Sequence, residues 1–236
     1  MFKNPLVVGY KGEIGLFILG RLLRNMPKAK NIWCTDVNDS RKDTVERIKK
    51  CDAIFLCVPI ECTACWLSEY RKYLKGKLII EQTSLKGYIH NCKCKCLKGL
   101  TVLSMHLLFK PSGTPNRADR AVGFLDKSYF QYKDTCDFIA EMCECAETVK
   151  FQDFDHHDYR MAVEQTLLHR SILVLDKMLG TNGRTFIGQK IRELATRIKT
   201  MNPVLFEIIQ SNEHFPEVLK EFKKELDNGP TLRPKI

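Results

Sequence analysis

The sequence lacks the features that mark membrane proteins and secreted proteins. No apolar run approaches the roughly 20 residues that a bilayer-spanning helix needs, and residues 1–5 lack the apolar core of a signal peptide. Lysine and arginine outnumber the acidic residues, which gives a net charge of +10, but the basic residues are interleaved with acidic ones and form no continuous basic arm. We therefore expect a cytoplasmic globular protein that binds an anionic small molecule and no nucleic acid or membrane.

A second C-x-x-C pair is also missing. The eleven cysteines include one such pair, Cys62 and Cys65, and the alternating run Cys92, Cys94 and Cys96. A structural zinc site usually joins two C-x-x-C pairs, or one pair and two spaced histidines. The sequence therefore predicts reduced thiols and no bound metal, because reduced cysteine often packs as a small apolar side chain in cytosolic proteins. Metal binding by Cys92, Cys94 and Cys96 stays open as the alternative.

What the chain does have, at its start, is an apolar run followed by a glycine turn and a helical pattern. Such a turn brings backbone N–H groups and the positive end of a helix dipole to a dinucleotide pyrophosphate. The spacing is G-x-x-G-x-x-G, because Tyr10 stands where a strict motif has its first glycine, so a plain βαβ turn is the alternative. We predict that the cofactor contacts are Gly9, Tyr10, Gly12, Glu13, Ile14 and Gly15.

An acidic residue follows at the distance that this motif requires. Asp36 ends the next apolar run, about 20 residues after the last glycine, where a carboxylate accepts hydrogen bonds from a ribose. This position favours NAD, although Arg41 and Lys42 would suit the 2′-phosphate of NADP if their loop folded back. We expect Val58, Pro59 and Thr83, at the ends of later strands, to line the same crevice.

The remaining pattern alternates strands and helices up to about residue 152 and is almost wholly helical afterwards. This order predicts an α/β fold, with a Rossmann-like, doubly wound parallel sheet in residues 1–152 and an all-α domain in 153–236. Strands are expected at 6–8, 32–35, 52–59, 77–80, 100–106, 121–125 and 148–151. The principal helices are expected at 44–50, 62–74, 129–145, 158–179, 187–199, 203–211 and 216–226.

Several short motifs, taken in order, resemble the prephenate/arogenate dehydrogenase family of tyrosine biosynthesis. They are the glycine turn, Gln82-Thr83-Ser84-Leu85-Lys86, His106-Leu107-Leu108-Phe109-Lys110-Pro111, His157-Asp158-x-x-x-Ala162, Gln165-x-x-x-His169, and Arg197 ahead of Asn202-Pro203. The resemblance implies NAD(P)-dependent oxidative decarboxylation of prephenate to 4-hydroxyphenylpyruvate, or of arogenate to tyrosine. It also implies a homodimer formed by the helical domain, which suits a short segment with several apolar faces.

The resemblance assigns roles residue by residue. His106 matches the histidine that takes the proton of the substrate hydroxyl, a role that suits an imidazole, and Ser84 matches the serine that orients it. Arg197 matches an arginine that binds a substrate carboxylate, and His169 matches a histidine that contacts the substrate. For His157 and its neighbours a role at a helix start is equally compatible with the sequence.

Two departures from the family pattern leave alternatives open. Leu107 and Lys110 replace the usual proline and glycine after the histidine, and the helical domain is short for the family. A dehydrogenase of similar architecture that acts on another small acid, or a regulatory protein that binds NAD(H) without turnover, would share the same motifs. The sequence does not distinguish prephenate from arogenate or reveal feedback by tyrosine.

Overall fold

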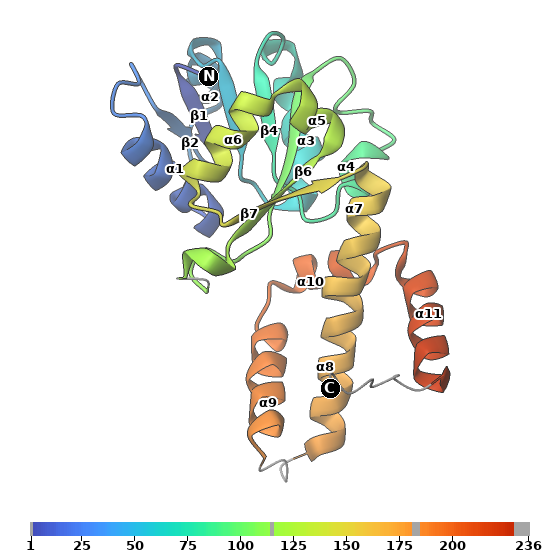
Figure 1. Ribbon diagram of the computed structural model, residues 1–236. Coiled ribbons are helices and arrows are strands. Elements are labelled where there is room, and N and C mark those ends of the chain that lie inside the picture. The colour runs from blue at the N-terminus through green and yellow to red at the C-terminus, as the bar shows by residue number, and fades with distance from the viewer. Residues whose placement is uncertain (1, 114–115, 181–184, 229–236) are drawn as a thin grey trace. The chain divides into compact units, whose positions relative to one another are not determined.

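The computed structural model describes residues 2–113, 116–180 and 185–228 (Figure 1). The chain divides into two compact units, Met1–His157 and Asp158–Ile236. The division therefore falls inside a helix, α7 (Phe154–Met161), a few residues after the boundary predicted at 152.

The first unit is built on one seven-stranded sheet. Its order is β2-β1-β3-β4-β5-β6-β7, and β1 to β5 are parallel. The strands are β1 (Pro5–Val8), β2 (Trp33–Thr35), β3 (Ala53–Leu56), β4 (Leu78–Glu81), β5 (Thr101–Leu107), β6 (Ala121–Leu125) and β7 (Glu147–Phe151). The order reverses direction between β1 and β3, and this switch point is where open α/β sheets bind ligands, at the carboxyl ends of their strands.

Helices cover both faces of this sheet (Figure 1). They are α1 (Glu13–Asn25), α2 (Arg41–Lys50), α3 (Ile60–Tyr70), α4 (Gly87–His90), α5 (Asp126–Gln131) and α6 (Lys133–Met142), with short 3-10 turns η1 (Arg71–Tyr73) and η2 (Arg117–Asp119). Successive strand residues point to opposite faces, so Val7 packs with α1 and α6 while Leu6 and Val8 pack with α2 and α3. The sheet is thus the middle layer between two apolar cores.

The sheet differs in one respect from a wholly parallel one. β6 pairs antiparallel with β5, and β7 pairs parallel with β6. The connection between β5 and β6 contains only η2 and no crossover helix in its described part, and a parallel neighbour needs such a crossover. The predicted helix 129–145 is also divided, because Tyr132 leaves the helical conformation (φ −128°, ψ 37°) between α5 and α6.

The second unit is helical in all its described elements. The π-helical turn η3 (Ala162–Leu167) continues α7 and is followed by α8 (Leu168–Leu179), α9 (Phe186–Lys199), α10 (Pro203–Gln210) and α11 (Phe215–Asn228). Asn202 caps α10 by accepting hydrogen bonds from Val204 and Leu205, and Thr166 donates to the Ile209 carbonyl. No helix among the described residues is both long and apolar enough to span a membrane.

Candidate functional site

The glycine turn is shaped by close contacts within the protein at two of its three glycines. Gly9 has a φ of +76°, and a Cβ built there would lie 2.6 Å from the Cys57 carbonyl oxygen. A Cβ on Gly15 would lie 2.1 Å from the Gly9 carbonyl oxygen. The fold itself therefore requires glycine at both positions.

Gly12 is different, since the surrounding protein leaves room for a side chain. Its backbone is extended (φ −73°, ψ 162°), and a Cβ would only reach ordinary contact, 3.4 Å, with the Gly9 carbonyl oxygen. Gly12 precedes α1, and no capping side chain accepts a hydrogen bond from the backbone N–H groups of the first turn of this helix. Backbone N–H groups at such a helix start are available to an anion, and the missing side chain lets a phosphate come close.

Asp36 holds the same turn from the end of β2. Its Oδ2 accepts a hydrogen bond from the Lys11 backbone N–H at 3.0 Å, and its Oδ1 accepts one from the Val37 N–H at 2.9 Å. Each carboxylate oxygen keeps a further lone pair with which to accept a ribose hydroxyl. Arg41, considered for a 2′-phosphate, instead pairs with Glu69 at 3.0 Å.

The other predicted cofactor contacts follow β3 and β4. Pro59 stands at the N-cap of α3, directly after Val58, and so lies at the carboxyl edge of the sheet beside the glycine turn. Thr83 follows β4, and its N–H and hydroxyl both donate to Glu81 Oε2, at 3.0 and 2.8 Å. The parallel order of β1, β3 and β4 therefore collects these residues at one edge of the sheet.

His106 lies near the carboxyl end of β5 and is buried. Its Nδ1 is 3.1 Å from Nε2 of His157, the last residue of the first unit, which is also buried. The Phe151 ring packs edge-on against His157, with 4.8 Å between the ring centroids. One ring nitrogen of His106 is thus held by His157, which fixes the plane of the His106 ring. The sequence had left the role of His157 open.

The surroundings keep His106 neutral. Burial is the main cause that moves the pKa of His106 well below its usual value, and the nearby His157 and the positive charge of Lys86 act in the same direction. Glu81 opposes this shift only weakly. A neutral imidazole at physiological pH accepts a proton, which an imidazolium does not do.

A buried ion pair lies close to this histidine. Lys86 Nζ is 2.9 Å from Glu81 Oε1, both side chains are almost fully buried, and Nζ also donates to the Met105 carbonyl. Burial disfavours ionised Glu81, but the Lys86 charge and hydrogen bonds from His90 and Lys86 outweigh it and hold the pKa of Glu81 well below its usual range. Sequence reasoning quoted Lys86 only as part of a motif and missed its pairing with Glu81, five residues earlier.

The segment after His106, which carries the replacements Leu107 and Lys110, is held to the start of α1. Leu107 continues β5, pairs with Val122 and is buried. Lys110 Nζ lies 3.8 Å from Glu13 Oε2, and the Ser112 N–H donates to Glu13 Oε1 at 2.9 Å. Lys110 therefore adds an ion pair between this segment and the glycine turn.

The remaining predicted site residues have fewer contacts. Ser84 is half-buried and makes no hydrogen bond with His106 among the described residues. His169 and Arg197 belong to the second unit, on α8 and α9. His169 is half-buried with an unpartnered buried Nδ1, and burial lowers its pKa, whereas Arg197 is exposed.

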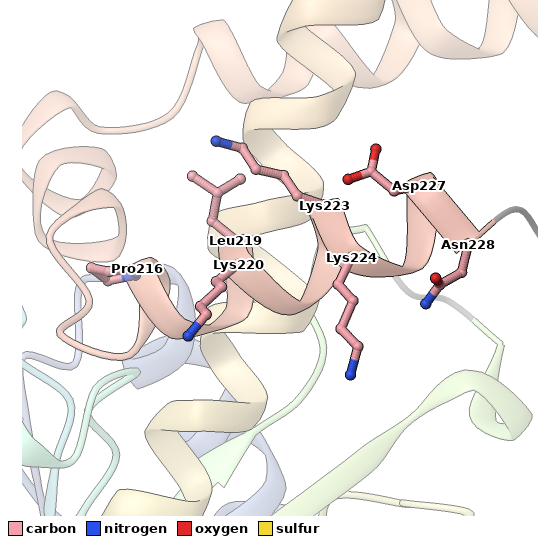
Figure 2. A pocket seen from close by; sticks show the side chains of 7 residues that line it. All are labelled: Pro216, Leu219, Lys220, Lys223, Lys224, Asp227 and Asn228. Carbon is pink, nitrogen blue, oxygen red and sulfur yellow. The ribbon is translucent and has the colours of Figure 1, made fainter.

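An open hollow runs along α11, as Figure 2 shows. It is lined by Pro216, Leu219, Lys220, Lys223, Lys224, Asp227 and Asn228. None of the residues predicted from the sequence to bind cofactor or substrate lines this hollow. We therefore place the candidate site at the carboxyl edge of the sheet.

Comparison with known proteins gives the family that part of the chain resembles. Residues 24–129 match the family described as "Prephenate dehydrogenase, nucleotide-binding domain". This segment contains Asp36, Ser84 and His106 and begins after the glycine turn. No curated protein matches the chain by sequence.

Solved structures share the fold over nearly the whole chain. Prephenate dehydrogenase from A. aeolicus, in complex with hydroxyphenyl propionate and NAD+, superposes with a TM-score of 0.70 at 18% identity. The match covers 97% of this chain and 89% of that one. Synechocystis arogenate dehydrogenase gives a TM-score of 0.66 at 16% identity and covers 95% of this chain and 90% of that one. The fold is thus confirmed, and residues 24–129 are similar to the nucleotide-binding domain of prephenate dehydrogenase.

Proposed function

We propose that this protein is an NAD-dependent oxidoreductase that oxidatively decarboxylates prephenate or arogenate in tyrosine biosynthesis. The observation that carries the proposal is His106, a buried neutral base at the edge of a nucleotide-binding sheet, with one ring nitrogen held by His157. The family of the domain supports the same chemistry.

The cofactor site fits a dinucleotide. The α1 start lacks a capping side chain, Gly12 leaves space in front of it, and Asp36 presents carboxylate oxygens to a ribose. Bound NAD+ would accept a hydride from the substrate. We propose NAD over NADP because Asp36 follows β2, where the motif expects an acid that accepts from a ribose, and Arg41 is paired with Glu69. The contacts proposed for Tyr10, Glu13, Ile14, Val58, Pro59 and Thr83 belong to this same site.

The proton acceptor follows from the histidine pair. If His106 Nδ1–H donates to His157, the lone pair on Nε2 is left to accept the proton of the substrate hydroxyl. As the hydroxyl becomes a ketone, hydride leaves the ring carbon, the carboxyl group departs as CO2, and its bonding electrons complete the aromatic ring. The protein thus supplies orientation and a base, while Ser84 stays proposed as a further orienting contact to His106.

The second unit is proposed to bind the substrate and to form a homodimer. Arg197 is the proposed partner of a substrate carboxylate, because a guanidinium forms two parallel hydrogen bonds with it, and His169 offers an unpartnered buried ring nitrogen. Exposed apolar side chains on α8 and α9 support pairing with a second copy. All eleven cysteines are free thiols, which supports a cytoplasmic location, and nucleic-acid or membrane partners are not proposed.

The direct test is an assay of the purified protein with NAD+ or NADP+ and either prephenate or arogenate. We expect reduced-cofactor absorbance to rise with NAD+ and one of the two substrates, together with release of CO2. Nucleotide binding without reduction on either substrate would favour a regulatory NAD(H)-binding protein. Reduction with another small acid alone would favour the dehydrogenase of different specificity.

A further inference from the structure

Three cysteine thiols converge in the connection between α4 and β5. The sulfur atoms of Cys92, Cys94 and Cys96 all lie within 4.8 Å of one another, and those of Cys92 and Cys94 are 2.7 Å apart. The connection enters β5 at its amino end, whereas His106 and the glycine turn lie at the carboxyl edge of the sheet. The cluster is therefore separate from the candidate active site.

The backbone turns in a way that brings alternate side chains together. In an extended strand, alternate residues lie about 6.6–7 Å apart along the chain, too far for a compact cluster. Here the Lys95 N–H donates to the Cys92 carbonyl at 2.9 Å, and Lys95 adopts a left-handed conformation with φ +49°. A non-glycine residue in that conformation is strained, and it persists only where the surroundings impose it.

A neighbouring arginine holds the connection in place. Arg71, from η1, donates to the carbonyl oxygens of Cys96, at 2.8 Å, and of Lys98. Cys96 is buried, while Cys94 is exposed, so the cluster reaches from the protein interior to the surface. Arg71 thus stabilises an arrangement of thiols that is open on one side.

The donor set suits a thiophilic metal ion. A Zn–S bond of about 2.3 Å places tetrahedral sulfur ligands about 3.8 Å apart. All three sulfur atoms lie within 4.8 Å of one another, so binding requires only that Cys92 and Cys94, 2.7 Å apart, separate by about 1 Å. Thiolates without carboxylates select Zn2+ over Mg2+ or Ca2+. Lys93, Lys95 and Lys98, in the same segment, offset the negative charge that three thiolates bring.

We infer that Cys92, Cys94 and Cys96 bind one Zn2+ ion, with water at the fourth coordination position. The ion fastens the connection that leads into β5, the strand that carries His106. The sequence favoured no bound metal, because it contains a single C-x-x-C pair. We propose the alternative instead, because the three thiols lie close together in space although their sequence spacing is not that of a zinc finger.

The test measures zinc in protein purified with reductant and without chelator. Elemental analysis is expected to find one zinc per chain, and Co2+ in its place is expected to give thiolate-to-metal charge-transfer absorption. Cys94→Ser, at the exposed position, should lose zinc in competition with a chromophoric chelator. Cys62→Ser and Cys65→Ser, which alter exposed thiols on α3 outside the cluster, should retain it as matched controls.

Three results would overturn the assignment. The first is fully reduced protein that binds neither Zn2+ nor Co2+. The second is zinc retained in the variant with all three cysteines replaced by serine, checked for folding by circular dichroism. The third is a Cys92–Cys94 disulfide, detected by alkylation and mass spectrometry, that persists in the reductant and prevents metal uptake. None of these measurements depends on the dehydrogenase activity.

Discussion

The two units differ sharply in how completely they bury their apolar side chains. Among the described residues, 32 of the 40 buried apolar side chains belong to the first unit. Eleven of the sixteen exposed large apolar side chains belong to the second, although it is about half as long. The first unit thus buries most of its apolar side chains in its own core, whereas the second exposes apolar side chains on its helices.

This difference predicts a division of labour in the proposed reaction. Groups that must be held to within a fraction of an ångström, such as His106 and the glycine turn, lie in the unit with more buried apolar side chains. Groups proposed to recognise a substrate carboxylate and a second copy lie in the more open unit. Variants in the two units should therefore affect different measured quantities.

The largest effect is expected from loss of the proposed base in the first unit. His106→Asn should lower kcat by about 10²- to 10⁴-fold, the usual contribution of a positioned general base. NAD+ affinity, measured by calorimetry, should change little. His156→Asn, an exposed neighbour of His157, is the matched control and should turn over normally. Wild-type turnover in His106→Asn would refute the mechanism.

The next largest effect is expected from a variant in the second unit. Arg197→Ala should raise KM about 10- to 150-fold, since hydrogen bonds to a charged group contribute about 1.5–3 kcal/mol. It should leave kcat nearly unchanged, because the contact with the substrate carboxylate is present both before and during the reaction. Lys190→Ala on the same helix removes an exposed charge paired with Glu193 and should leave KM unchanged. A selective fall in kcat would place Arg197 with the chemistry instead.

The third prediction compares two glycines of the first unit. Gly15→Ala forces a Cβ against the Gly9 carbonyl and should cost about 1–3 kcal/mol of unfolding free energy or more. Gly12→Ala should fold with a smaller loss and weaken NAD+ binding about tenfold, a cost of about 1.4 kcal/mol. Thermal unfolding and calorimetry separate the two. Equal NAD+ affinity of Gly12→Ala and wild type would remove Gly12 from the cofactor site.

Sequence reasoning identified the elements of the first unit because their signals are local. The glycine turn, the apolar runs and Asp36 follow one another along the chain, and the sheet places them together by a general rule. The family resemblance is confirmed for the domain at residues 24–129.

Contacts between residues that are far apart in the sequence could not be predicted from such local signals. His157 meets His106 across 51 positions, and Lys86 reaches a strand that is not its own. The reversal at β6 was also missed, because its signal was the lack of a helix between two strands.

A smaller effect is expected at the apolar faces of the second unit. The wild type should sediment at about twice the 27.3 kDa chain mass. Val174→Glu with Leu194→Glu, both at exposed positions, should give a monomer with unchanged NAD+ affinity, since a charge is costly to bury in an interface. The variant Leu23→Glu, which changes an exposed side chain on α1 in the first unit, should remain a dimer. A double variant that stays dimeric would place the interface elsewhere.

The smallest effect is the pH dependence of the first unit's stability. Because the pKa of His106 lies below its usual value in the folded protein, the unfolded chain takes up a proton that the folded protein does not, once the pH falls below about 6.5. Stability should therefore fall there by up to about 1.4 kcal/mol per pH unit for this one group. The lowered pKa of Glu81 acts at lower pH, since its stabilisation is complete above about 4.5 and is lost as the pH falls further.

The unfolding midpoint, followed from pH 8 to pH 4 in wild type and His106→Asn, isolates the histidine contribution. The variant should lack the part of the slope that begins near pH 6.5, while His169, whose pKa is also lowered, contributes equally to both proteins. Turnover should likewise persist below the pH at which free histidine takes up a proton. The pH at which activity is lost should therefore be lower than the sequence motif alone predicts. Identical slopes in the two proteins would mean that His106 titrates normally and that the dense core around it does not set its charge.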